Sequence, residues 1–160
     1  MEERFNLKEV KVHRTTEGTI FEIAFAVIAI LVWGIIIWMV HQAPDIVATH
    51  FDASGQPNDW GPKYGILIPC GIIFLVSVGL MTTAYFPHRI NMPFRITNIQ
   101  QVKLAIRSVR IAAIILLIIC LAIVYTILGM KSPNATPILA LVVLLILVMI
   151  VFSILISKAK

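Results

Sequence analysis

The chain has 160 residues, of which 59% are hydrophobic and 13% are charged, and its formal net charge is +5 at pH 7. Soluble domains carry roughly a quarter charged residues, so this composition excludes an ordinary soluble protein. The basic residues form no recognisable nucleic-acid recognition module, and we therefore expect no nucleic-acid partner.

Four apolar runs predict an all-α integral membrane protein that forms a single membrane domain over residues 1–160. Each run has about 20 to 25 residues, the length that an α-helix needs to cross a hydrocarbon core about 30 Å thick. The predicted transmembrane helices cover residues of about 18–42, 64–86, 105–130 and 136–157, with an outward loop at 43–63 and a cytoplasmic basic connection at 87–104.

The distribution of Lys and Arg predicts how these helices are oriented. Most of the 13 cationic residues lie in the N-terminal tail, in segment 89–110 and at the C-terminus, whereas Lys63 and Lys131 flank the other two connections. By the positive-inside rule, we expect both termini to be cytoplasmic. The 43–63 loop and a short turn at 131–136 then face outward.

Inside the first two helices, a few residues suggest special roles. Thr19 to Glu22 match a capping box, which would place Glu22 at the membrane border; a second interpretation is a proton or cation site in a transporter. Pro69 predicts a kink or a short interfacial helix before the second span. Cys70 and Cys120 are expected at different depths, as packing residues without a disulfide.

The basic connection contains a helical pattern. Ile99, Val102, Ile106 and Val109 recur at helical spacing. This pattern predicts an extension of the third helix whose apolar stripe lies against lipid headgroups; a docking surface for a cytoplasmic regulator is the alternative. Beside it runs a basic stripe of Lys103, Arg107 and Arg110.

The outward loop is rich in turn residues and holds the chain's candidate polar site. Its imidazole and carboxylates raise a metal hypothesis, yet one His without Cys is a poor ligand set, and we expect neither a metal nor a cofactor. The chain shows no arrangement typical of a catalytic nucleophile or a phosphate-binding glycine loop, so we do not expect an enzyme. The polar side chains considered are those of Asp45, His50, Asp52 and Asp59.

The loop motif resembles a known family. The pattern Pro44-Asp45-x-x-x-x-His50-Phe51-Asp52-x-x-Gly55-x-Pro57-x-x-Trp60-x-x-Lys63, set between two apolar helices, resembles the N-terminal domain of the SdpI-like bacterial membrane proteins. Residues 89–98 also resemble the family's entry into its third helix. The resemblance covers about the first 110 residues and is that of a short form without the C-terminal block of the full immunity proteins.

The resemblance implies a location and a function. The family's best understood members sit in the bacterial inner membrane, confer immunity against a secreted membrane-active peptide toxin, and hold a transcriptional repressor at the membrane. It implies an outward recognition or structural role for the matching loop residues. We therefore expect a ligand-binding site in the loop, formed by His50, Phe51, Asp52, Gly55, Trp60 and Lys63.

Three functions remain open from the sequence. The leading hypothesis is a non-enzymatic protein whose outward loop recognises or neutralises a membrane-active peptide or a lipid-like ligand, with Trp60 and Phe51 as apolar anchors. The second is a small transporter component that uses Glu22 and Pro69. The third is an accessory subunit of a larger membrane complex, packed through small residues such as Gly34 and Gly71.

Overall fold

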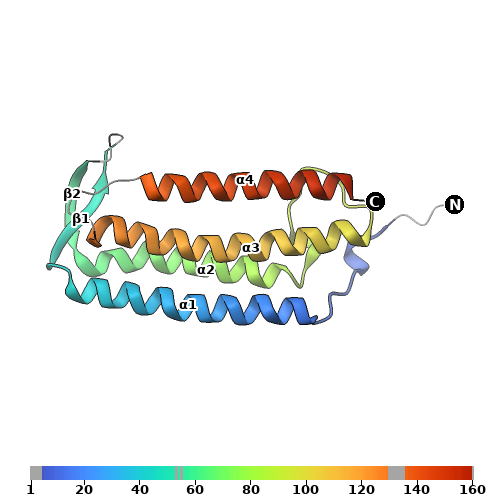
Figure 1. The fold of residues 1–160 in the computed structure, drawn as a ribbon, viewed down its shortest axis with the longest axis horizontal. Coiled ribbons are helices and arrows are strands. Elements are labelled where there is room, and N and C mark those ends of the chain that lie inside the picture. The colour runs from blue at the N-terminus through green and yellow to red at the C-terminus, as the bar shows by residue number, and fades with distance from the viewer. Residues whose placement is uncertain (1–4, 53, 55, 130–135, 160) are drawn as a thin grey trace.

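A computed structural model of the chain describes residues 5–52, 54, 56–129 and 136–159, and it forms a bundle of long helices with a β-hairpin across one end (Figure 1). The long helices are α1 (Thr16–Gln42), α2 (Leu67–Thr83), α3 (Ile99–Val124) and α4 (Thr136–Lys158). The strands are β1 (Ile46–Phe51) and β2 (Pro57–Pro62), and the short turns are η1 (Leu7–Glu9), η2 (Lys63–Ile66), η3 (Pro87–Arg89) and the π-helical η4 (Tyr125–Gly129).

The predicted four-span, all-α membrane architecture is confirmed. All four long helices are apolar enough to cross a membrane, and the two shortest candidate spans, Lys63–Thr83 and Ile138–Lys158, have 21 residues each. At a rise of 1.5 Å per residue, that length matches a hydrocarbon core of about 30 Å. The described ends of the chain lie at the same end of the bundle, opposite the hairpin (Figure 1). We call these two ends the terminal end and the hairpin end.

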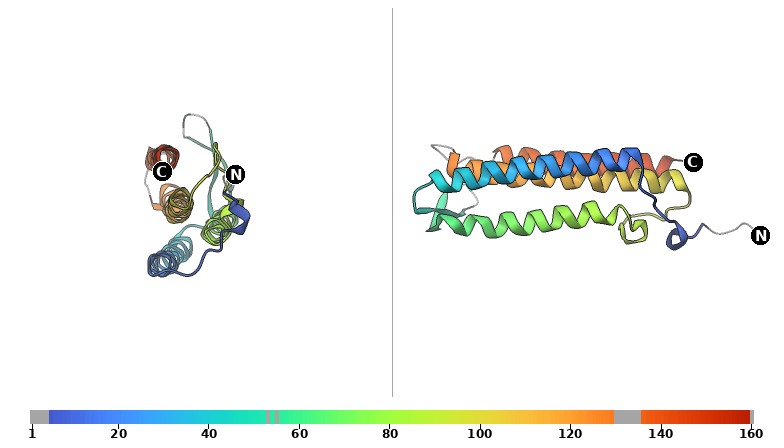
Figure 2. Two further views of the ribbon diagram at one scale, coloured as in Figure 1. Left: turned by 90° about the vertical axis from the view of Figure 1, so that its right-hand side faces the viewer. Right: turned by 90° about the horizontal axis from the view of Figure 1, so that it is seen from below.

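Helix α3 lies at the centre of the bundle and packs against each of the other three long helices (Figure 2). Small buried residues on α3, including Ala105, Ala113 and Cys120, let its neighbours approach closely. Between α1 and α2, the rings of Trp33 and Phe74 meet edge to face, with centroids 5.7 Å apart. By contrast, no residue in the most apolar stretch of α4 is fully buried, because α4 packs against α3 along one face and leaves the other exposed.

The beginning of α3 differs from the predicted start of the third span, whereas the helical extension predicted before that span is present. The helix begins at Ile99 rather than near residue 105, because Asn98 caps it by accepting a hydrogen bond from the Gln101 amide at 3.0 Å. The apolar residues that the sequence placed before the third span are therefore part of α3. Instead of lying against headgroups, Val102, Ile106 and Val109 are buried in a core that Ile156 of α4 completes. Residues 131–135 of the predicted outward turn lie outside the described residues.

Helix α1 begins with a different cap from the one predicted. Thr15 is the N-cap, and its hydroxyl accepts a hydrogen bond from the Gly18 amide at 3.0 Å. Glu22 therefore lies beyond the first turn and is not the acid of a capping box.

The start of α2 agrees with one of the two predictions made from Pro69. The short helix η2 precedes α2, as the alternative to a kink. Pro69 sits in the first turn of α2, where a missing N–H costs little.

The two cysteines lie at the same depth, which corrects the prediction of different depths. Both are free and buried, and the Cys120 thiol lies 3.9 Å from the carbonyl oxygen of Cys70. They sit in the core cluster nearest the hairpin, where they act as small packing groups between α2 and α3.

Candidate functional site

The predicted outward loop is folded as an antiparallel β-hairpin. In Figure 1 the two strands cross the end of the bundle, from the end of α1 past the start of α4. The register pairs Ile46 with Pro62 and Ala48 with Trp60, and it is interrupted at Thr49 by a bulge. The segment is therefore a defined structural element, where the sequence predicted a turn-rich loop.

The sequence explains why the first strand forms and how the second adapts to it. The first strand carries β-branched residues, which suit a pleated surface. The second begins and ends with proline, at positions where a missing N–H is tolerated. Between them, Gly61 suits a close approach of the two strands, because a Cβ there would lie 3.0 Å from the methyl carbon of Thr49.

Strand β1 attaches the hairpin to the bundle. Val47 and Ala48 are each 5% exposed. Val47 joins a core cluster with Val40 of α1, Ile66 of η2 and Val124 of α3. This apolar contact fixes the hairpin to the ends of three elements, so the site is carried by a packed scaffold.

Lys63 adds a polar attachment at the same place. Its ammonium group donates to the Ala43 carbonyl at 3.0 Å and lies 3.3 Å from the Asp45 carboxylate. Its backbone amide also donates to the Asp45 carbonyl at 3.0 Å. The Lys63 side chain is 12% exposed, and the contacts described here hold the base of the hairpin together.

Asp52 organises the tip of the hairpin. One of its carboxylate oxygens accepts hydrogen bonds from the Ser54 amide at 2.9 Å, the Ser54 hydroxyl at 2.6 Å and the Gln56 amide at 2.9 Å. The Asp52 amide in turn donates to the Gln56 carbonyl at 2.9 Å. An Asp side chain that bonds the backbone ahead of it stabilises a tight turn. Gly55, another predicted site residue, lies outside the described residues.

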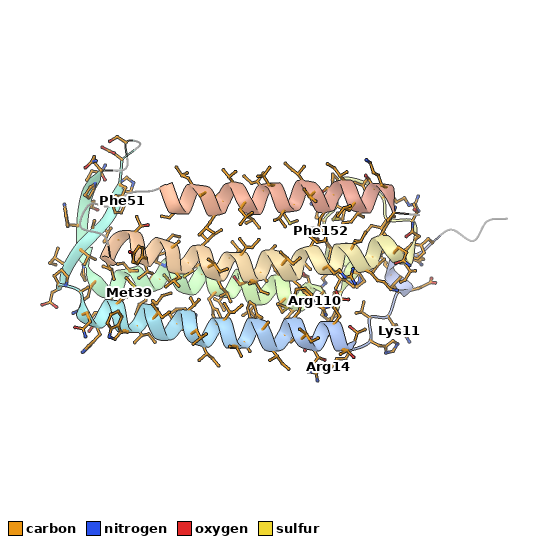
Figure 3. The ribbon with its side chains drawn as sticks, viewed as in Figure 1. Lys11, Arg14, Met39, Phe51, Arg110 and Phe152 are labelled. Atoms are coloured by element: carbon orange, nitrogen blue, oxygen red, sulfur yellow. The ribbon has the colours of Figure 1, made fainter. Side chains whose placement is uncertain are left out.

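Trp60 and His50 are both exposed, one on each strand of the hairpin. Trp60 is 59% exposed, an arrangement typical of an interfacial or binding aromatic residue. The His50 ring nitrogen Nδ1 lies 2.5 Å from the Asn58 side-chain oxygen on the opposite strand. Phe51, at the end of β1, is half-buried (labelled in Figure 3). The sequence pattern missed Asn58, which orients the imidazole, because the contact depends on strand pairing.

The hairpin thus divides the predicted site residues into two groups. Trp60 and His50 are exposed on the strands, whereas Lys63 and Asp52 make contacts within the protein. Across residues 5–52, 54, 56–129 and 136–159, no three His, Cys, Asp or Glu side chains gather as metal ligands. Asp45 and Asp59, considered for a metal, lie at the hairpin's base and in β2 instead.

At the terminal end, polar side chains link the helices. The Glu22 carboxylate lies 3.3 Å from Arg14 and accepts a hydrogen bond from the Tyr85 hydroxyl. That hydrogen bond raises the pKa of Tyr85 above its usual value, because the bond requires the phenolic proton. Glu17 binds Arg107 through two hydrogen bonds, at 2.5 and 2.8 Å. The carboxylate considered for proton transport is thus engaged between two elements.

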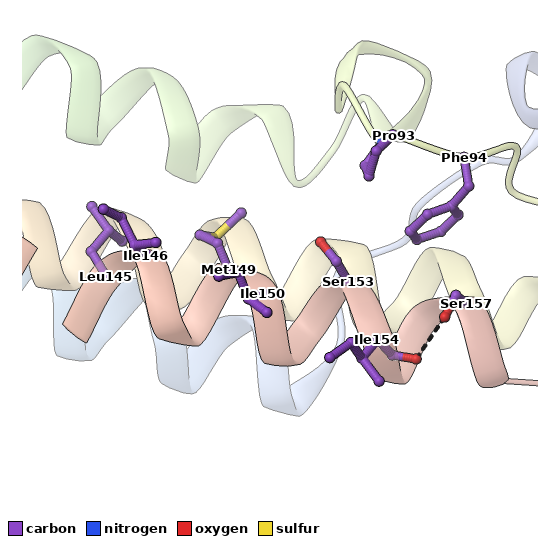
Figure 4. Close-up of a pocket in the computed structure, with 9 residues that line it drawn as sticks. All are labelled: Pro93, Phe94, Leu145, Ile146, Met149, Ile150, Ser153, Ile154 and Ser157. Carbon is purple, nitrogen blue, oxygen red and sulfur yellow. Dashed lines mark hydrogen bonds between the residues drawn. The ribbon is translucent and has the colours of Figure 1, made fainter. Parts of the chain in front are cut away.

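An apolar groove of about 690 Å³ lies between α4 and the connection that precedes α3 (Figure 4). Pro93 and Phe94 face Met149 and neighbouring residues of α4 across it. The hydroxyl of Ser157 donates to the Ile154 carbonyl at 2.9 Å. With its apolar lining on a membrane-spanning helix, the groove offers a surface that lipid chains can fill.

Residues 27–74 match a sequence family described as a domain of unknown function (DUF1648). The matched segment runs from α1 through both strands of the hairpin into α2. No curated protein sequence and no solved structure matches the chain. The match therefore covers the hairpin together with the adjoining parts of α1 and α2.

Proposed function

We propose that this chain is a non-enzymatic protein of the bacterial inner membrane whose outward β-hairpin recognises a membrane-active peptide or lipid-like ligand, as in toxin immunity or signalling. The observation that carries this proposal is a hairpin attached to the bundle core with Trp60 and His50 left exposed. The matched family segment contains the whole hairpin. The resemblance of the loop motif to the SdpI-like proteins supports the same function.

The hairpin offers a direct way to bind an extended peptide. Its sheet has two described strands, so each strand has an outer edge that no third described strand pairs. A peptide that adds to such an edge gains main-chain hydrogen bonds, while exposed side chains give specificity. Trp60 supplies a large apolar contact, and the His50 imidazole, oriented by Asn58, supplies a polar one.

The distribution of positive charge supports an outward hairpin. At the hairpin end, Lys63 is neutralised by Asp45. The terminal end carries most of the Lys and Arg residues, including Arg14, Arg107 and Arg110. By the positive-inside rule, the terminal end is cytoplasmic and the hairpin faces the compartment that a secreted peptide reaches first.

The test compares the survival of a sensitive bacterial strain, with and without this protein, across a panel of membrane-active peptides. We expect Trp60→Ala and His50→Ala to lose protection. Matched controls are Trp38→Ala, which removes a Trp that is 62% exposed on α1, and His41→Ala, in the last turn of α1. Both controls should protect as the wild type does. Membrane fractionation checks that every variant inserts.

Two results would contradict the proposal. Protection that survives both hairpin substitutions would place recognition elsewhere. A wild-type chain that protects against no peptide would remove the immunity function altogether.

A second candidate is an accessory subunit, favoured by the exposure of the membrane helices. No residue in the most apolar stretch of α4 is fully buried. A Cβ added at Gly34, Gly71 or Gly79 would meet no other atom within 4 Å. These positions leave room for a partner helix to approach. Cross-linking in native membranes, followed by mild detergent extraction, would show a stable larger complex if this candidate holds and the chain alone if it does not.

A further inference from the structure

A basic cleft of about 460 Å³ lies at the terminal end, between the segment before α1 and the first half of α3. One wall is formed by residues 10–13, Thr15 and Glu17, and the other by residues of α3 between Ile99 and Arg110. Figure 3 shows Lys11 on the N-terminal segment and Arg110 deeper in the bundle. The cleft is distant from the hairpin and takes no part in the function proposed above.

Arg110 is the deepest charged group of this cleft. It is 5% exposed, and in the part of the chain that the structure describes its Nε has no hydrogen-bond partner. Its guanidinium carbon lies 5.9 Å from the centre of the Phe21 ring. A buried N–H without an acceptor is costly, so an acceptor that enters the cleft beside Arg110 would relieve this cost.

The chain is shaped to hold Arg110 in this position. Gly18 lies beside it, and a Cβ at Gly18 would be 2.8 Å from the Arg110 Nη2 atom. The Gly18 amide is held by the Thr15 hydroxyl at 3.0 Å. Because Gly18 has no side chain, the Arg110 guanidinium fits between α3 and the start of α1.

The charges that line the cleft favour an anion. Lys11, Lys103, Arg107 and Arg110 are cationic, and the carboxylate among the lining residues is that of Glu17. Arg107 already binds that carboxylate through two hydrogen bonds. The cations of the lining therefore outnumber this carboxylate, which also attracts Arg110 and Lys103 through space. The cleft keeps an excess of positive charge, and its low dielectric strengthens the attraction for an anion.

The floor of the cleft is apolar and its position matches the border of a membrane. Val102 and Ile106 line it and are 1% and 8% exposed. Arg110 lies level with the first turn of α1, where that helix enters the candidate span that begins at Thr16. A ligand with an anionic head and an apolar tail fits these surroundings, because its head meets the cations and its tail follows the helices.

We propose that this cleft binds the phosphate headgroup of an anionic phospholipid, with Arg110 as the buried donor and Lys11 and Lys103 at the entrance. The planar guanidinium suits phosphate oxygens, to which it can donate two parallel hydrogen bonds. The lipid headgroup becomes a structural link between the N-terminal segment and α3. Occupancy by an acidic segment of a soluble protein is the competing outcome of the test.

The test uses the full chain, purified in a neutral detergent and titrated with short-chain phosphatidic acid while thermal unfolding is followed. We expect a saturable rise in the unfolding temperature, and no such rise with the matching phosphatidylcholine. Arg110→Gln and Lys103→Gln should each weaken the affinity about tenfold or more, because each removes a charged hydrogen bond to the phosphate. Arg95→Gln, an exposed residue outside the cleft, is the matched control and should bind as the wild type does.

The outcomes separate the possible sources of the anion. Inorganic phosphate or glycerol phosphate that binds as tightly as the lipid would overturn the lipid assignment. Unchanged affinity in Lys103→Gln would overturn the site even if Arg110→Gln fails to fold, because Lys103 is exposed and its substitution leaves the core intact. No saturable effect of phosphatidic acid would also overturn the proposal and would favour an acidic protein segment.

Discussion

Removal of the Lys63 ammonium group should release the hairpin from the bundle far more than removal of its carboxylate partner. The ammonium group makes two contacts, at 3.0 Å to the Ala43 carbonyl and at 3.3 Å to the Asp45 carboxylate. The Asp45 side chain is 94% exposed, so the ion pair is worth about 0–1 kcal/mol. The bond to Ala43 is charged and part-buried, and such bonds contribute about 1.5–3 kcal/mol.

These magnitudes give distinct expectations for two substitutions. Lys63→Met loses both contacts at nearly constant volume, and Asp45→Asn loses only the ion pair. The two lost contacts sum to about 1.5–4 kcal/mol. Since about 1.4 kcal/mol is a factor of ten in an equilibrium, Lys63→Met should increase local opening of the hairpin by about 10- to 700-fold. Asp45→Asn should increase it by at most about fivefold.

Hydrogen–deuterium exchange of the protein in lipid nanodiscs measures this opening directly. The informative amides are those of β1 and of Lys63, which donates to the Asp45 carbonyl at 3.0 Å. Amides in the middle of α3 serve as the internal control and should not change. Equal acceleration by the two substitutions would refute the reasoning, because it would show that the exposed ion pair holds the hairpin.

The remaining predictions concern the terminal end and the centre of the bundle. Because the hydrogen bond to Glu22 raises the pKa of Tyr85, its stabilisation is present below the ordinary tyrosine pKa of about 10 and is lost as the pH rises through the raised value. Glu22→Gln should therefore lower the pH at which one tyrosine ionises, as ultraviolet absorbance reports, and an unchanged titration would contradict this contact. Ala113 is 0% exposed between α1, α2 and α3, so Ala113→Leu should cost about 1–3 kcal/mol by overpacking. Thermal unfolding should show no comparable loss for Ile118→Leu, at a position that is 40% exposed, and equal losses would argue against the tight packing of α3.

The membrane spans could be predicted from sequence because an apolar run of about 20 residues has few other stable arrangements. The hairpin could not. Strand β2 reads Pro57 to Pro62, with residues that are depleted in strands, and its pairing depends on contacts that β1 makes with distant helices. The role of Asn58 as partner of His50 follows from that pairing and carries no local signal.

Charged residues show the same limit. Arg110 was predicted as part of a basic stripe, yet it is buried, because Gly18 on another helix leaves space for it. Lys63 was predicted as a ligand contact, and the structure directs its ammonium group to the carbonyl of Ala43. Residue type and spacing indicated that these positions matter; which groups they contact is decided by tertiary structure.

The polar attachments at both ends of α1 have a consequence for the surrounding lipid. Lys63 fixes the end of this helix at Ala43, and Glu22, bound by Arg14 and Tyr85, fixes its beginning. The apolar stretch between them, residues 23–40, spans about 27 Å at 1.5 Å per residue. Because contacts at both ends hold α1 to its neighbours, the helix cannot shift along its axis to match a thicker bilayer. The lipid must therefore thin around the protein. The bundle thus has a set hydrophobic height, which favours its residence in the thinner regions of a membrane.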